Sequence, residues 1–173
     1  QAIRFIMQAS SAVLEAHRLG IVHRDLKPAN LRVVRRADGS EIIKVLDFGV
    51  AKRMPGAQGE AETHETQPGT IVGTPLYTSP EQLRGSSAVD ARTDIWALGV
   101  ILHEAISGEP PFLGNSIPEI SAKILLEEPK PLSELRATVP KALSELVLRA
   151  LQKQPDKRFA NVSELALALL PFA

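Results

Sequence analysis

The residues with the clearest chemical potential lie in two polar segments, one at 23–30 and one that opens with Asp47. The first contains Asp25, Lys27 and Asn30. Carboxylate and amide oxygens are hard ligands of the kind that magnesium binds, and a carboxylate can also accept a proton from a hydroxyl. In an extended loop, Asp25 and Lys27 are two positions apart and can point the same way. Each segment alone is typical of an ordinary solvated turn, so its function can be inferred only together with other segments of the chain.

Several segments, taken in their order, resemble the signature of the protein kinase family. They are His23-Arg24-Asp25-Leu26-Lys27-Pro28-Ala29-Asn30, Asp47-Phe48-Gly49, Gly73 to Glu81, Asp94 to Gly99, and Arg158. One such segment would be weak support, but the ordered set extends over nearly the whole chain. Lys27 and Thr74 are typical of the serine/threonine branch, and the style of the Gly73–Glu81 segment resembles the bacterial members.

The resemblance implies a division of labour in phosphoryl transfer from ATP. Asp25 would orient the incoming hydroxyl and accept its proton, and Lys27 would reach the γ-phosphate. Thr74 would lie near both of them. Asn30 and Asp47 would bind Mg²⁺, or Mn²⁺ in its place, together with phosphate oxygens.

The same resemblance gives other residues structural roles. His23 and Phe48 would support the catalytic and magnesium loops, and Asp94 would begin the buried central helix. Glu81 and Arg158 would form a buried ion pair that ties the end of the long loop to the last helices. The alternatives are that Asp94 only favours a helix N-terminus, and that Glu81 and Arg158 are unrelated surface charges.

Residues 47–81 resemble an activation segment. An arginine beside the catalytic aspartate, here Arg24, usually pairs with a phosphorylated residue in such a segment. Thr66 and Thr70 are the favoured acceptors, and Lys52 would complete the phosphate pocket. The alternative is that these threonines are merely polar loop residues.

Arg32 departs from the family pattern. A large apolar residue usually stands two positions after the loop asparagine and forms the floor under adenine. Strand alternation points Arg32 away from Leu31 and towards that floor, where its guanidinium could still stack on a base. A glycine-rich loop and its lysine–glutamate pair are also missing, so we expect a fragment without the N-terminal lobe that is inactive by itself.

The elements that must position these residues follow from periodicity and from helix-ending residues. The predicted elements are a helix at 1–19 ended by Gly20, strands at 31–34 and 42–46, a long loop at 50–79, and helices at 95–107, 116–127, 140–153 and 161–171. With the resemblance, they predict the mainly helical C-terminal lobe of a two-lobed α+β kinase, as one domain over 1–173.

Composition and charge limit the classes of partner that the chain is expected to bind. Twenty basic and twenty acidic residues give a formal net charge of zero, which gives no reason to expect nucleic acid or a membrane surface as partner. The chain has no cysteine and no apolar run long enough to span a bilayer, so we expect a cytoplasmic kinase portion. The implied partners are protein substrates with serine or threonine and the N-terminal lobe.

Two other functions compete with an active serine/threonine protein kinase. A catalytically silent kinase-like scaffold would bind partners or nucleotide, but Asp25, Lys27, Asn30 and Asp47 are all present. A small-molecule phosphotransferase of related fold would use a similar loop, but the Gly73–Glu81 segment resembles one that places a protein substrate. Transfer to a generic protein rather than to a small alcohol separates these functions.

Overall fold

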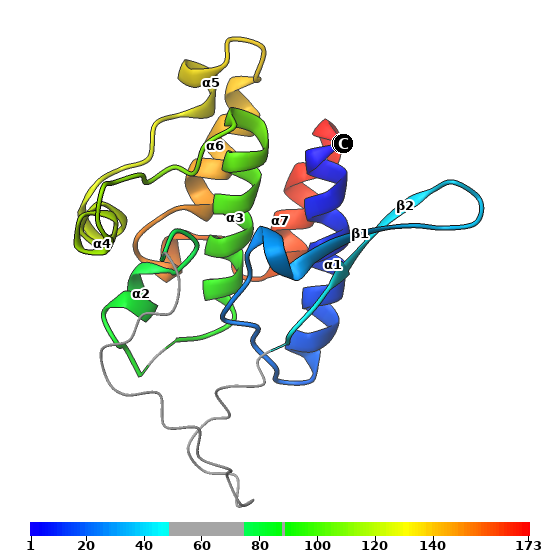
Figure 1. Cartoon of the computed structure of the whole chain (residues 1–173), viewed down its shortest axis with the longest axis horizontal. Coiled ribbons are helices and arrows are strands. Elements are labelled where there is room, and N and C mark those ends of the chain that lie inside the picture. Colours follow the sequence, from blue (N-terminus) through cyan, green and yellow to red (C-terminus); the bar gives the residue numbers. More distant parts are fainter. Residues whose placement is uncertain (49–74, 88) are drawn as a thin grey trace, which may run out of the picture.

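The computed structural model describes residues 1–48, 75–87 and 89–173. This part is mostly helical and contains a two-stranded sheet (Figure 1). The helices are α1 (Ala2–Arg18), α2 (Pro80–Leu83), α3 (Arg92–Ser107), α4 (Ile117–Leu126), α5 (Leu132–Leu135), α6 (Lys141–Ala150) and α7 (Val162–Leu169). The 3-10 turns are η1 (Pro28–Asn30), η2 (Pro155–Lys157) and η3 (Leu170–Phe172), and the strands are β1 (Leu31–Arg35) and β2 (Glu41–Val45).

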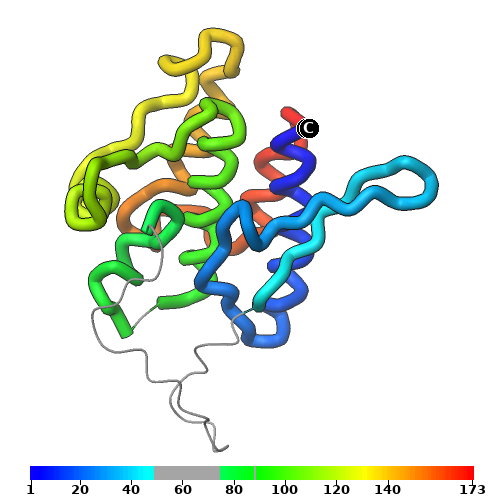
Figure 2. Tube along the Cα trace, in the orientation of Figure 1, coloured from blue at the N-terminus to red at the C-terminus, as the bar shows by residue number. Residues whose placement is uncertain are grey.

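Helix α1 forms because its apolar residues recur at the helical period. Ile6, Ala9 and Val13 lie on one face and are fully buried, where α1 packs against α3 and α7. The helix ends at Arg18, and Gly20, the predicted stop, follows two residues later with a φ of +73° that suits glycine. Figures 1 and 2 show α1 and α7, the first and last long elements, lying side by side.

Helix α3 is the buried centre of the fold. It is apolar nearly all round, and Trp96 at its first turns is fully buried. Gly108 ends it with a φ of +94°. A methyl group on Gly99 would come within 2.9 Å of the Ala150 Cβ on α6, so this glycine permits the close packing of α3 on α6.

The β1–β2 hairpin extends from the helical body past α1 (Figures 1 and 2). One of its faces packs on the core through Leu31, Ile43 and Val45. The side-chain amide of Gln8 on α1 continues the hydrogen bonding beyond β2, because its Oε1 accepts from the Ile43 N–H at 2.7 Å. The hairpin is therefore held by α1 and carries loop segments at both of its inner ends.

The observed boundaries differ from the predictions in instructive ways. The strands run over 31–35 and 41–45, one residue from the expected positions. Helix α6 ends at Ala150 instead of near Lys153, and the carbonyls of Gln152 and Lys153 accept hydrogen bonds from the Arg158 guanidinium. Helix α5 was not predicted, and most of the expected loop at 50–79 lies outside the described residues. Among the described helices, none is both long and apolar enough to cross a membrane.

Candidate active site

The loop between α1 and η1 has an unusual backbone at the residue before Asp25. Arg24 has a φ of 65°, and Asp47 has a φ of 55°; among described residues they are the two non-glycine positions with positive φ. Such conformations are disfavoured for side chains with a Cβ and persist where surrounding contacts hold them. Arg24 directly precedes Asp25, and Asp47 is itself one of the residues that the sequence singled out for chemistry.

The carboxylate of Asp94 binds the backbone of this loop. Asp94 lies in the first turn of α3 and is fully buried. Its Oδ2 accepts from the His23 N–H and its Oδ1 from the Arg24 N–H, both at 2.9 Å. The ring Nε2 of His17 also lies 2.7 Å from Asp94 Oδ2. Asp94 is thus a loop anchor and more than a helix N-terminal residue.

Asp25, Lys27 and Asn30 come together at the loop surface. Lys27 Nζ lies 2.7 Å from Asp25 Oδ2, with 41% of the lysine side chain and 68% of the aspartate side chain exposed. Asn30 is buried, and its Nδ2 donates to the Asp25 carbonyl at 2.7 Å. That bond fixes the amide so that the opposite atom, Oδ1, remains available as an oxygen ligand.

Asp47 follows β2 on a segment that adjoins Asn30. The Leu46 N–H donates to the Asn30 carbonyl at 2.9 Å, which joins the two segments. The buried ring of His23 donates from Nε2 to the Leu46 carbonyl at 2.8 Å and lies 5.0 Å from the Phe48 ring, between centroids. His23 and Phe48 therefore support the turn that presents Asp47.

The side-chain oxygens at this site suit a metal ion that also binds the phosphate groups of a ligand. Asn30 and Asp47 offer two hard oxygens on adjoining segments, and no group of three or more acidic, cysteine or histidine residues suited to a metal occurs in the described part. Mg²⁺ is typically bound by one or two protein oxygens, with substrate phosphates and waters as its other ligands. The residues present fit that mode of binding and do not form a closed protein cage.

Arg32 lies directly opposite Lys44 in the hairpin. Because Leu31, Ile43 and Val45 face the core, alternation places these two cations on the other face. Both are exposed, and within the described residues neither has an acidic side chain within salt-bridge distance. Arg32 thus lies on the face opposite Leu31, as strand alternation predicted, with a second cation beside it; its place under adenine stays a prediction.

Glu81 and Arg158 form a buried, two-pronged ion pair. Arg158 Nη1 donates to Glu81 Oε1 and Nη2 donates to Glu81 Oε2, each at 2.7 Å. The guanidinium also donates to the backbone carbonyls of Gln152 at 2.7 Å and Arg92 at 3.0 Å. The pair joins α2, at the end of the long loop, to the segment between α6 and α7, so the alternative of unrelated surface charges is wrong.

The remaining site residues named from the sequence fall outside the described part. These are Thr74, Lys52, Thr66 and Thr70, together with Gly49 and Gly73 of the two motifs. Their roles stay predictions.

Three further residues, not predicted from the sequence, contribute contacts at or near the site. His17 contacts Asp94, as described above, and Gln82 donates from Nε2 to the Arg24 carbonyl at 2.8 Å. The Tyr77 hydroxyl donates to Glu104 at 2.7 Å, and burial, reinforced by this carboxylate, raises the pKa of Tyr77 well above its usual value. No local sequence pattern marks any of the three, because each acts through a partner far away in the sequence.

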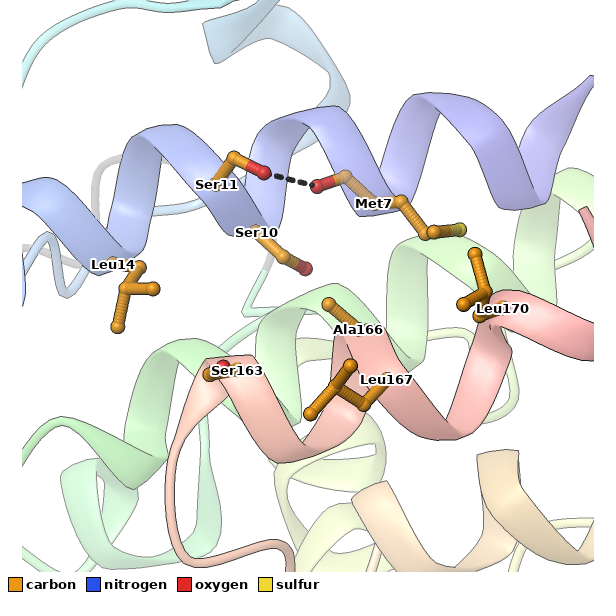
Figure 3. A pocket seen from close by; sticks show the side chains of 8 residues that line it. All are labelled: Met7, Ser10, Ser11, Leu14, Ser163, Ala166, Leu167 and Leu170. Carbon is orange, nitrogen blue, oxygen red and sulfur yellow. Dashed lines mark hydrogen bonds between the residues drawn. The ribbon is translucent and has the colours of Figure 1, made fainter.

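A separate pocket of about 150 Å³ lies between α1 and α7 (Figure 3). Its lining consists of small and apolar side chains, namely Met7, Ser10, Ser11, Leu14, Ser163, Ala166, Leu167 and Leu170. None of them is titratable near neutral pH, and none of the site residues lines it. It is not the candidate active site.

The protein kinase domain family matches residues 1–168. The chain is 39% identical over 170 residues to the serine/threonine-protein kinase PknB of Mycolicibacterium smegmatis, covering 98% of this chain and 26% of that protein. It is 41% identical over 163 residues to the serine/threonine-protein kinase pkn3 of Myxococcus xanthus, covering 93% of this chain and 29% of the relative. The chain therefore spans about a quarter of the length of these relatives. With a family match over nearly every residue and the ordered loops assembled in one place, the chain belongs to the protein kinase family.

Proposed function

We propose that this chain forms the catalytic lobe of a serine/threonine protein kinase, which transfers the γ-phosphoryl group of ATP to serine and threonine hydroxyls of proteins. The observation that carries the proposal is the contact of Asp25 with Lys27 and Asn30 on one loop, which the Leu46–Asn30 hydrogen bond joins to the segment of Asp47. These groups are suited to phosphoryl transfer, in which a protein mainly positions reactants and neutralises charge.

Each residue has a role in the proposed step. Asp25 accepts the proton of the substrate hydroxyl as its oxygen forms a bond to the γ-phosphorus, and the bond from that phosphorus to the ADP oxygen breaks. Lys27, 2.7 Å from Asp25, neutralises charge on the transferred group and keeps the carboxylate oriented. Asn30 and Asp47 would hold Mg²⁺, which offsets phosphate charge when bound.

Several parts of the proposal rest on the family alone. Thr74 would contact Asp25 and Lys27, and it would help to position the substrate hydroxyl. Phosphorylation of Thr66 or Thr70 would order the activation segment through Arg24 and Lys52. Protein substrates are favoured over small alcohols because segment 73–81 resembles the substrate-placing segment of the family.

The 173 residues contain neither a glycine-rich loop nor the lysine–glutamate pair that holds ATP phosphates in kinases. We therefore expect the 173-residue chain, assayed by itself, to transfer phosphate at a negligible rate. The N-terminal lobe of the kinase domain would be its obligatory partner. This dependence is tested by comparing phosphate transfer by the 173-residue chain with transfer by a longer protein that also contains the N-terminal lobe.

The decisive test uses a protein that contains both this chain and the N-terminal lobe, called the full-length kinase below. It measures transfer of radiolabelled γ-phosphate from MgATP to a generic basic protein. The control is Asp25→Asn, which keeps the size of the side chain but removes the proton acceptor. We expect label on serine or threonine with the unchanged enzyme and a loss of at least about a hundredfold with the variant, the usual contribution of a general base. Equal incorporation by both would overturn the assignment of Asp25, and no incorporation by either would favour a silent scaffold.

A further inference from the structure

Gln82 occupies a position that a helix cap alone does not explain. It lies in the short helix α2, directly after Glu81, and is half-buried. Its amide oxygen faces α3 and the start of α2, while its amide nitrogen reaches across 58 positions of sequence to the Arg24 carbonyl at 2.8 Å. Arg24 is the residue before Asp25, so this contact reaches the backbone of the catalytic loop.

The direction of the Gln82 amide is determined by its surroundings. Its Oε1 accepts from the Ser79 N–H at 3.1 Å and from the Thr93 hydroxyl at 2.7 Å. A backbone N–H can only donate and a backbone carbonyl can only accept. The oxygen must therefore face Ser79 and the NH₂ group must face Arg24. Ser79 and Thr93 are buried, so this network is shielded from competing water.

The Gln82 bond completes a clamp on the backbone of Arg24. The Arg24 N–H is bound by Asp94 Oδ1 at 2.9 Å, and its carbonyl is bound by Gln82 Nε2. Arg24 has a φ of 65°, a conformation that needs external contacts to persist. A bond at each end of the residue fixes both adjoining peptide planes. The second of these planes leads directly into Asp25.

We propose that Gln82 is a positioning residue for phosphoryl transfer, which holds the Arg24 carbonyl and thereby the orientation of Asp25. The inference rests on the proposed function, because it assigns Gln82 to the geometry of that same carboxylate. It also connects the end of the activation segment to the catalytic loop through a side chain. A change in the position of α2 would therefore be passed to Asp25 by way of the Arg24 carbonyl.

Gln82→Glu separates this role from helix capping. A glutamate three residues after a serine N-cap still completes a capping box, and its oxygen still accepts from Ser79 and Thr93. It has no N–H for the Arg24 carbonyl, and its second oxygen would meet that carbonyl as one acceptor against another. The control is the same substitution at Gln152, because Gln152 Nε2 also faces a backbone carbonyl, that of Leu148, at the longer distance of 3.5 Å and away from the catalytic loop.

The experiment measures kcat and KM for ATP in the full-length kinase, with the thermal unfolding temperature of each variant. We expect Gln82→Glu to lower kcat about tenfold, the factor that corresponds to losing one hydrogen bond of ordinary strength. KM for ATP should stay near that of Gln152→Glu, whereas the unfolding temperature should fall by roughly a few degrees, because the Arg24 carbonyl loses its donor and faces a second acceptor. Equal kcat values for the two variants, with an active parent enzyme, would overturn the inference and leave Gln82 as a cap.

If the parent enzyme shows no phosphate transfer, the proposed function fails, but the contact between Gln82 and Arg24 can still be tested by a measurement that does not depend on catalysis. Amide hydrogen exchange on the 173-residue chain reports the backbone of residues 23–27 directly. We expect faster exchange there in Gln82→Glu than in Gln152→Glu, at unchanged exchange in α3. Equal exchange at residues 23–27 in both variants would refute the clamp.

Discussion

Replacing Glu81 by glutamine keeps the shape of its side chain and removes the charge that balances Arg158. The Arg158 side chain has no exposed surface and that of Glu81 is 8% exposed, so neither water nor salt can take the place of the lost carboxylate. Breaking a buried ion pair by removing one partner costs about 3–5 kcal/mol, because the other charge stays buried without compensation.

The contacts of Arg158 set where in that range each substitution falls. In Glu81→Gln the guanidinium retains the amide oxygen and the backbone carbonyls of Gln152 and Arg92, so we expect about 3 kcal/mol. In Glu81→Ala both carboxylate oxygens are lost and a cavity is added, so we expect about 5 kcal/mol. At this chain length, the loss corresponds to a fall of roughly 6–20 °C in the unfolding temperature.

The assay is urea unfolding of the 173-residue chain, followed by far-ultraviolet circular dichroism. The double variant Glu81→Leu with Arg158→Met should recover most of the loss, since an apolar pair of similar volume leaves no charge stranded. The reasoning would be refuted by a loss below about 1 kcal/mol in Glu81→Gln, which is the range of exposed ion pairs. A double variant less stable than either single change would refute it equally.

Three further changes test other parts of the structure. Gly99→Ala should destabilise the chain by about 1–3 kcal/mol in the same assay, because the added methyl group overlaps Ala150; an unchanged urea midpoint would contradict this packing. Burial lowers the pKa of His103 below its ordinary value of 6.5, so the unfolded chain binds the proton more tightly and stability should fall as the pH drops below about 6.5. Unfolding from pH 5 to 8 should show this slope reduced in His103→Gln, and equal slopes would exclude the effect. Arg32→Leu should lower KM for ATP in the full-length kinase by about threefold to tenfold, through apolar contact worth about 1 kcal/mol under the base; an unchanged or higher KM would show that Arg32 itself serves the nucleotide.

The parts of the fold that depend on local sequence could be predicted. The period of the apolar residues and Gly20 gave helix α1 and its end, and the continuous apolar run ending at Gly108 gave the buried helix α3. The hairpin followed from two β-rich runs around an Asp38-Gly39 turn. In each case the chain needs only neighbours within a few positions to adopt the observed conformation.

Features that depend on side chains meeting over long distances could not be predicted from local patterns. Helix α6 ends at Ala150, and the carbonyls of Gln152 and Lys153 just beyond it bind the Arg158 guanidinium, which also binds the sequence-distant Glu81. His17 and Gln82 reach Asp94 and Arg24 across 77 and 58 positions of sequence. The Glu81–Arg158 pair spans a comparable gap, and only the family resemblance suggested it.

The described contacts make the start of α3 the common support of the catalytic loop. Two adjacent residues there, Thr93 and Asp94, are both buried. Asp94 binds the Arg24 N–H directly, whereas Thr93 orients the Gln82 amide that binds the Arg24 carbonyl. Both ends of the strained residue before Asp25 therefore depend on the same helical turn. A change that shifts this turn of α3 should therefore disturb the orientation of Asp25 through both bonds to Arg24.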